Sequence, residues 1–95
     1  MKIIRAQVYI NKKFNEEHGK YICDKIDKCI ENTYIDYLCY FSNYNNKEVM
    51  LFDIYTQGNT FKECESLYQR MKNIIKDNTR ESPHQLAKIK AEKIL

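Results

Sequence analysis

The chain has 95 residues, of which 43% are hydrophobic and 31% charged, a composition that suits one globular domain and excludes a disordered chain. Its apolar runs are too short for a membrane span of about 20 residues, and the N-terminus lacks the apolar stretch of a signal peptide. The formal net charge of +3 is too small to indicate a nucleic-acid partner by itself. We therefore expect a single cytoplasmic domain, residues 1–95, without membrane contact.

The N-terminal part predicts a strand followed by a helix. Residues 2–10 alternate apolar and other side chains with a period of two, which is typical of a half-buried strand. Asn15 is a suitable N-cap, and Glu16 and Glu17 suit the first turn of a helix. Apolar residues then recur at helical spacing, so the sequence predicts a helix over residues 16–31.

The middle of the chain predicts a β-hairpin. A two-residue turn at Asn45 and Asn46 is favoured because asparagine tolerates the positive φ angles of a type I′ turn. The numbers of facing residues then sum to 91, and a slip of one residue would move each partner to the opposite face. This register creates one strongly apolar face that we expect to pack on the helices: Ile35, Tyr37, Cys39, Phe41, Met50, Phe52 and Ile54.

The C-terminal part predicts two helices. Gly58 ends the third strand, and Thr60 with Glu63 three residues later forms a capping-box pattern. An apolar face follows at helical spacing, which makes this the strongest helix prediction in the chain. Pro83 suits a first helical position, and a loosely amphipathic last helix is predicted over residues 83–94.

The predicted order is β-α-β-β-α-α, a two-layer α+β fold with the helices on one face of the sheet. A right-handed crossover gives a three-stranded antiparallel or mixed sheet of order 1-3-2. This topology resembles a truncated ferredoxin-like arrangement, with a helix in place of its last strand. Residues 1–78 form the predicted core, and helix 83–94 is an appended interaction element. It covers either the outer sheet face or the open edge of the first strand.

The sequence indicates neither a metal site nor disulfides. The thiols show no C-x-x-C spacing, and the histidines are far apart in sequence, whereas zinc ligands usually occur in close pairs. We expect reduced, mostly buried thiols that behave as small hydrophobic groups. The residues concerned are Cys23, Cys29, Cys39 and Cys64, with His18 and His84 as surface helix residues.

No catalytic motif is present in the sequence. A Gly-rich phosphate loop is missing, and neither histidine belongs to a recognisable constellation of nucleophile, base and carboxylate. We therefore predict a protein that is not an enzyme and needs no cofactor. The enzymatic alternative is a small active site built on Asp36 and Asp53, which the predicted register places on one sheet face.

The outer face of the predicted sheet is the main functional lead, because large apolar side chains occupy it as well as the inner face. An exposed apolar patch of this kind marks an interaction surface, although strand propensity or a covering last helix would also explain it. We predict a small protein-binding module, an adaptor or inhibitor, whose partner is another protein or a second copy of the chain. The predicted contact residues are Tyr9, Tyr34, Leu38, Tyr40, Val49, Leu51 and Tyr55.

The alternative partner is single-stranded nucleic acid, since aromatic residues on an open sheet stack bases. Against it, the third strand lacks the ribonucleoprotein pattern, and Asp36 and Asp53 place negative charge on the same face. A composition rich in Asn, Ile, Lys and Tyr suits an AT-rich genome such as that of a bacteriophage, so an inhibitor of a host defence system is one candidate. The basic patch of the nucleic-acid alternative is Lys2, Arg5, Lys12 and Lys13.

Overall fold

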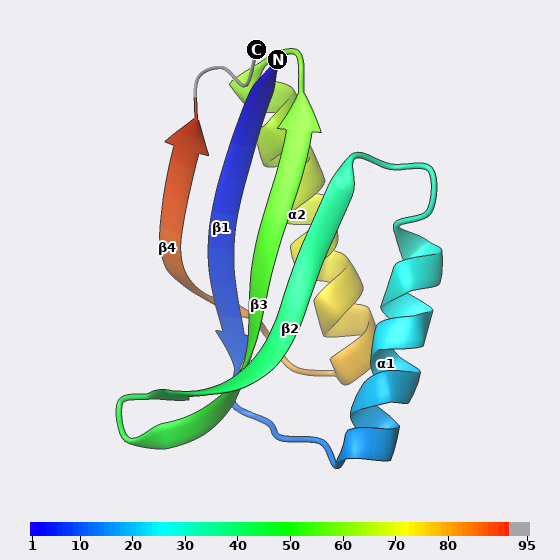
Figure 1. Ribbon diagram of the computed structural model, residues 1–95, viewed down its shortest axis with the longest axis vertical. Helices are drawn as coiled ribbons and strands as arrows, with labels where there is room; N and C mark the ends of the chain where they lie inside the picture. Colours follow the sequence, from blue (N-terminus) through cyan, green and yellow to red (C-terminus); the bar gives the residue numbers. More distant parts are fainter. Residues whose placement is uncertain (92–95) are drawn as a thin grey trace.

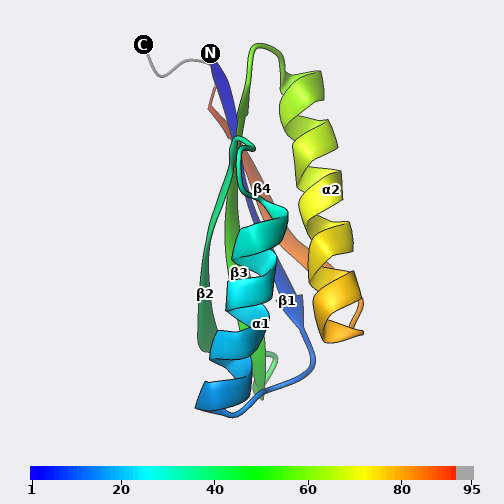
Figure 2. The ribbon, with the colours of Figure 1, turned by 90° about the vertical axis from the view of Figure 1, so that its right-hand side faces the viewer.

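The computed structural model describes the backbone of residues 1–91 and the side chains of residues 1–88. All neighbouring strands pair antiparallel, in the order β2-β3-β1-β4. Helix α2 lies behind the sheet in Figure 1 and to its right in Figure 2, and α1 stands beside β2, where its Ile22 and Ile26 join the same core. The elements are β1 Lys2–Ile10, α1 Glu16–Cys29, β2 Ile35–Tyr44, β3 Lys47–Gly58, α2 Phe61–Thr79 and β4 His84–Ala91.

The last element is a strand, so the predicted helix over residues 83–94 and the three-stranded sheet of order 1-3-2 are wrong. β4 pairs with β1 and completes a β-α-β-β-α-β ferredoxin-like arrangement, with a bulge at Leu86 where the register shifts. Residues 92–94 of the predicted helix lie outside the described residues.

The physical reason is that helix propensity is a weak preference that tertiary context overrides. The segment from His84 is rich in Gln, Leu, Ala and Lys, which favour a helix by only a few tenths of a kcal/mol each. The second edge of β1 offers a full row of backbone donors and acceptors that require partners. Alternation of small or apolar residues with lysine along residues 87–91 was the available signal for a strand.

The β2–β3 hairpin and its register are confirmed. Asn45 and Asn46 have φ angles of 50° and 63°, as a type I′ turn requires. Facing residues pair as predicted, for example Cys39 with Phe52 and Tyr40 with Leu51. The alternating pattern and the turn chemistry were sufficient for this prediction because both act between residues close in sequence.

The helices begin at the predicted caps and bury one side against the sheet. The Asn15 side chain accepts a hydrogen bond from the His18 backbone N–H (2.7 Å), and the Thr60 hydroxyl accepts one from the Glu63 N–H (3.2 Å). Neither described helix is long and apolar enough to cross a bilayer. The helix residues buried in the core are Ile22 and Ile26 of α1 and Cys64, Tyr68, Met71 and Ile75 of α2.

Candidate functional site: the outer face of the sheet

The face of the sheet opposite the helices is open along its described part, and Figure 1 shows it from the front. β4 extends the sheet at the edge of β1 and does not lie over this face, so the alternative in which a last helix covers the outer face does not apply to the described residues. Directly opposite residues of antiparallel strands point to the same side, so the register defines rows of side chains across the face. One row crosses all four strands: Tyr40, Leu51, Tyr9 and His84.

Aromatic rings gather at the hairpin end of this face. The Tyr9 ring lies 4.8 Å from the Tyr44 ring and 5.2 Å from the His84 ring, measured between centroids. The tip of the β2–β3 hairpin swings across towards the ends of β1 and β4 (Figure 1), in agreement with the contact between the Tyr44 and Tyr9 rings. Large side chains on the flanking strands thus cover the central strand, and Val49 and Leu51 are buried without a helix above them.

The exposed apolar side chains of the outer face are concentrated on β2. Leu38, Tyr40 and Tyr44 are 60%, 44% and 38% exposed, and all three point to the outer side of this strand. Tyr9 and Tyr55, on β1 and β3, are half-buried. The surface that a partner can contact is therefore narrower than the predicted site, and we call Leu38, Tyr40 and Tyr44 the β2 row.

Charge in the middle of the face is internally paired. The Arg5 guanidinium donates two hydrogen bonds to the buried Asp53 carboxylate, at 3.0 and 2.8 Å, and holds the pKa of that carboxyl below its usual range. Asp36 accepts a hydrogen bond from the Tyr37 backbone N–H (2.9 Å). Each carboxylate thus has its own hydrogen-bond partner, and the described residues contain no group of three or more His, Cys, Asp or Glu side chains that could hold a metal ion.

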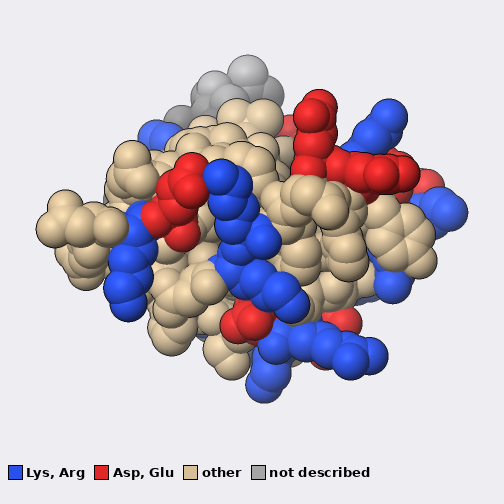
Figure 3. All heavy atoms as spheres, turned by 90° about the horizontal axis from the view of Figure 1, so that it is seen from below, with Lys and Arg blue, Asp and Glu red and all other residues tan. Residues whose placement is uncertain are grey.

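The predicted basic residues are spread over the molecule. Lys2 lies over the Phe61 ring, whereas Lys13 follows the other end of β1 and pairs with Glu48 at 3.0 Å. Lys12 lies over the Phe14 ring. Seen from below, basic and acidic side chains alternate on this end of the molecule, with no large field of one sign (Figure 3). The structure therefore does not bring Lys2, Arg5, Lys12 and Lys13 together.

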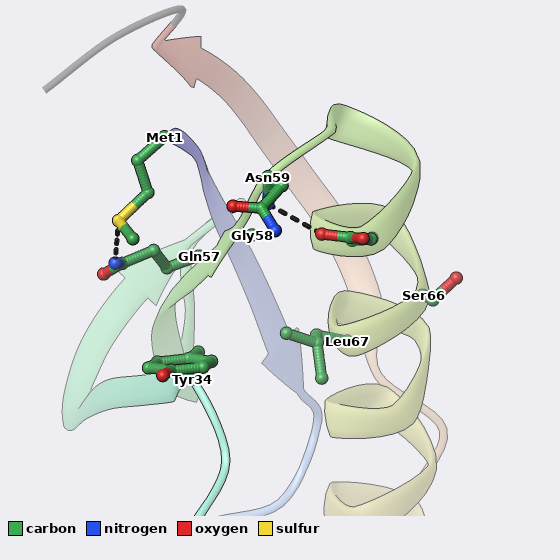
Figure 4. A pocket seen from close by; sticks show the side chains of 8 residues that line it. Met1, Tyr34, Gln57, Gly58, Asn59, Ser66 and Leu67 are labelled. Atoms are coloured by element: carbon green, nitrogen blue, oxygen red, sulfur yellow. Dashed lines mark hydrogen bonds between the residues drawn. The ribbon is translucent and has the colours of Figure 1, made fainter.

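Tyr34 lies apart from the β2 row, just before β2 and at the opposite end of the strand from the hairpin turn. It lines a hollow of about 450 Å³ between the end of β3 and the first turns of α2, together with Met1, Gln57 and Leu67 (Figure 4). Glu63 is the acidic residue of this hollow, and its carboxylate accepts a hydrogen bond from the Asn59 backbone N–H (2.7 Å). The lining offers packing area and no reactive constellation.

The two edges of the sheet differ in how they resist pairing with another chain. Edge strands usually carry lysine, proline or a bulge for this purpose. β4 contains a bulge and two lysines, Lys88 and Lys90. β2 has an unbroken register with β3 over ten residues and contains neither lysine nor proline. The strand that bears the β2 row is therefore also an unprotected edge.

Two residues of the face were missed by the sequence prediction. Tyr44 alternates in step with Leu38 and Tyr40 in the predicted register, so the sequence already indicates that its side chain points to the outer face. Its contact with Tyr9, however, depends on the bend of the hairpin. His84 was assigned to a helix, and only the pairing of β4 with β1 places its ring against Tyr9.

Comparison with known proteins gives the fold and no more. No family model and no curated protein matches the sequence. Among solved structures the chain is similar to a de novo designed protein, Foldit4, with a TM-score of 0.53, 12% sequence identity and 98% of each chain covered. A likeness at this identity supports the α+β architecture and carries no information about activity.

Proposed function

We propose that this protein is a non-enzymatic protein-binding module that pairs the open edge of β2 with an extended strand of its partner. The observation that carries the proposal is the coincidence of an unprotected edge and the β2 row on one strand. Strand addition gains affinity from backbone hydrogen bonds and specificity from alternate side chains. Leu38, Tyr40 and Tyr44 are those alternate side chains.

The backbone of β2 supports this mode of binding. The Tyr37 N–H bonds to the Asp36 side chain, so it points away from β3 and towards the open edge. Amides of alternate residues in a strand point to the same side, which puts the N–H groups of Cys39, Phe41 and Asn43 along the same edge. A partner strand therefore meets a regular ladder beside the β2 row.

The occupant we propose for the isolated protein is a second copy of the chain. Two β2 strands that pair antiparallel about Tyr40 set Tyr40 against itself, Leu38 against Ser42 and Asp36 against Tyr44. No like charges oppose each other in this arrangement, and a two-fold axis makes each surface its own complement. The resulting sheet is continuous, with the two β2 rows side by side on its outer face.

Light scattering after gel filtration tests the proposal on the wild type and on Tyr40→Lys. We expect the wild type at tens of micromolar to show twice the monomer mass of 11.5 kDa. The lysine substitution places a charge on the axis of the pair and should yield monomers. Tyr21→Lys is the matched control, because Tyr21 is an exposed tyrosine on α1 and not on β2, and its substitution should leave the dimer intact.

A wild type that stays monomeric at several hundred micromolar would rule out the second copy as the occupant. Equal loss of the dimer in Tyr40→Lys and Tyr21→Lys would place the contact on a surface other than β2. Folding of each variant is checked by its far-ultraviolet circular dichroism, since Tyr40 and Tyr21 are both partly exposed and should tolerate lysine.

Binding of single-stranded nucleic acid is the second candidate function, favoured by the ring cluster of Tyr9, Tyr44 and His84 on an open sheet. It predicts binding of an oligothymidine that weakens steeply between 50 and 200 mM salt, as is usual for phosphate contacts. Binding lost on replacement of the four dispersed basic residues by glutamine would favour this candidate. The protein-binding proposal expects no such binding, since Arg5 is engaged by Asp53.

A further inference from the structure

Two cysteines that lie apart in the sequence border one hollow on the helix side of the sheet. Cys23 of α1 and Cys39 of β2 both line a hollow of about 200 Å³ between this helix and the hairpin, together with Lys20, Phe41 and Met50. Both residues are partly exposed, so solvent and small reagents reach the hollow at these two positions.

The surroundings of the pair hold α1 and β2 together at this point. The Tyr37 hydroxyl, next to Cys39 on β2, donates to the Asp27 carboxylate (2.7 Å) and approaches the backbone carbonyl of Cys23 (3.2 Å). The proximity of the Cys39 thiol lowers the pKa of Cys23 to about 7, and the proximity of the Cys23 thiol raises the pKa of Cys39. Cys23 is thus the nucleophile of the pair, and Cys39 keeps its proton.

We propose that Cys23 and Cys39 form a redox-active thiol pair, which a peroxide converts into a disulfide that links α1 to β2. The proposal is independent of the docking function of the outer face. Its basis is the shared hollow, the partial exposure of both residues and the Tyr37 contacts that hold α1 against β2 beside them.

The chemistry balances with hydrogen peroxide as the two-electron oxidant. The Cys23 thiolate attacks one peroxide oxygen, so an S–O bond forms, the O–O bond breaks and the leaving hydroxide takes up a proton to give water. The Cys39 thiol then loses its proton, and its sulfur attacks the sulfenic acid of Cys23. The S–S bond forms, the S–O bond breaks and a second water leaves. A dithiol reductant reverses the result by thiol–disulfide exchange.

The other two cysteines act as internal controls. Cys29 does not line the hollow that Cys23 and Cys39 share, and Cys64 is not accessible from the surface. Cys29 is exposed, and its sulfur accepts a long contact of 4.0 Å from the Asn78 amide. Cys64 is buried in the core, with its thiol directed at the backbone carbonyl of Lys2 (3.3 Å). Burial raises the pKa of the Cys64 thiol, so this residue should be inert while the protein is folded.

The test uses the folded Cys29→Ser variant, because cleavage after lysine would leave Cys29 and Cys39 on one peptide, residues 29–47. The protein is treated with a small excess of hydrogen peroxide, quenched with catalase, unfolded and alkylated with N-ethylmaleimide. We expect the mass to fall by two hydrogens, the number of maleimide adducts to drop from three to one, and residues 21–25 to be joined to residues 29–47. In the protein that also carries Cys39→Ser, dimedone should trap a sulfenic acid at Cys23.

Three outcomes would overturn the proposal: both thiols remaining open to alkylation after oxidation, a disulfide that involves Cys64, or dimedone capture at Cys39 in a Cys23→Ser protein at the rate seen for Cys23. The same oxidation in urea separates a property of the fold from one of the chain. Linkage of residues 21–25 to residues 29–47 should slow at least tenfold when the structure that holds the two sulfurs together is lost.

Discussion

Two leucines on the outer face differ in burial. Truncating each of them to alanine measures how far side chains of the sheet itself bury this face. Leu51 of β3 is 6% exposed, whereas Leu38 of the neighbouring β2 is 60% exposed. Leu→Ala at a buried site costs about 2–5 kcal/mol, and we expect about 2–3 kcal/mol for Leu51 because side chains alone cover it. Leu38 buries less than half of its surface. Burial of a whole leucine side chain contributes about 2 kcal/mol, so Leu38→Ala should cost less than about 1 kcal/mol of stability.

Urea unfolding followed by circular dichroism measures the difference, which should appear as a gap of about 1–2 M between the two midpoints. Both variants lose the same atoms from a strand, so intrinsic propensity cancels in the comparison. Protein concentrations below one micromolar keep any dimer from adding to the stability of the chain. Equal losses of stability in the two variants would refute the reasoning, since Val49 and Leu51 would then belong to an open face available to a partner.

Three further predictions concern the ion pair, the turn and the last strand. Arg5 lowers the pKa of Asp53 in the folded protein. The stability that this carboxylate contributes is therefore present above its ordinary pKa of about 3.9 and is lost as the pH falls through the lower folded value. The urea midpoint of Asp53→Asn should change less than that of the wild type between pH 5 and 2. Asn46→Gly should raise the free energy of unfolding by a few tenths of a kcal/mol and Asn46→Ala should lower it by about 1 kcal/mol, because residue 46 has a φ of 63°. A chain that ends at residue 82 exposes the second edge of β1 and should form large oligomers on gel filtration; an elution as uniform as that of the full chain would contradict the protective role of β4.

The elements that could be predicted from the sequence are those whose determinants lie close together along the chain. The caps at Asn15 and Thr60 act within one helical turn, and both helices begin where these residues predict. The turn at Asn45 and Asn46 with its flanking alternation specifies the hairpin register, because a slip by one residue would turn the apolar side chains to the wrong face. The inner face of the sheet follows from the same alternation.

The candidate site was only partly predictable. The parity of the hairpin residues placed Leu38, Tyr40, Val49 and Leu51 on the outer face, as found. Their burial could not be predicted, because it depends on how the flanking side chains and the bent hairpin tip cover β3. The four cysteines were expected to be mostly buried, yet Cys64 alone is, while Cys29 is exposed on the surface of α1.

What only the tertiary structure decided are the interactions between segments distant in sequence. Residues 84–91 become a strand because the open edge of β1, some eighty residues earlier in the chain, provides backbone partners that outweigh a weak helix preference. The same pairing puts His84 beside Tyr9 and leaves β2 as the unprotected edge. Packing of α1 against the sheet brings Cys23 and Cys39 to one hollow. Local patterns specify which face a side chain takes, whereas its neighbours across the sheet depend on backbone hydrogen bonds and packing that form only in the complete fold.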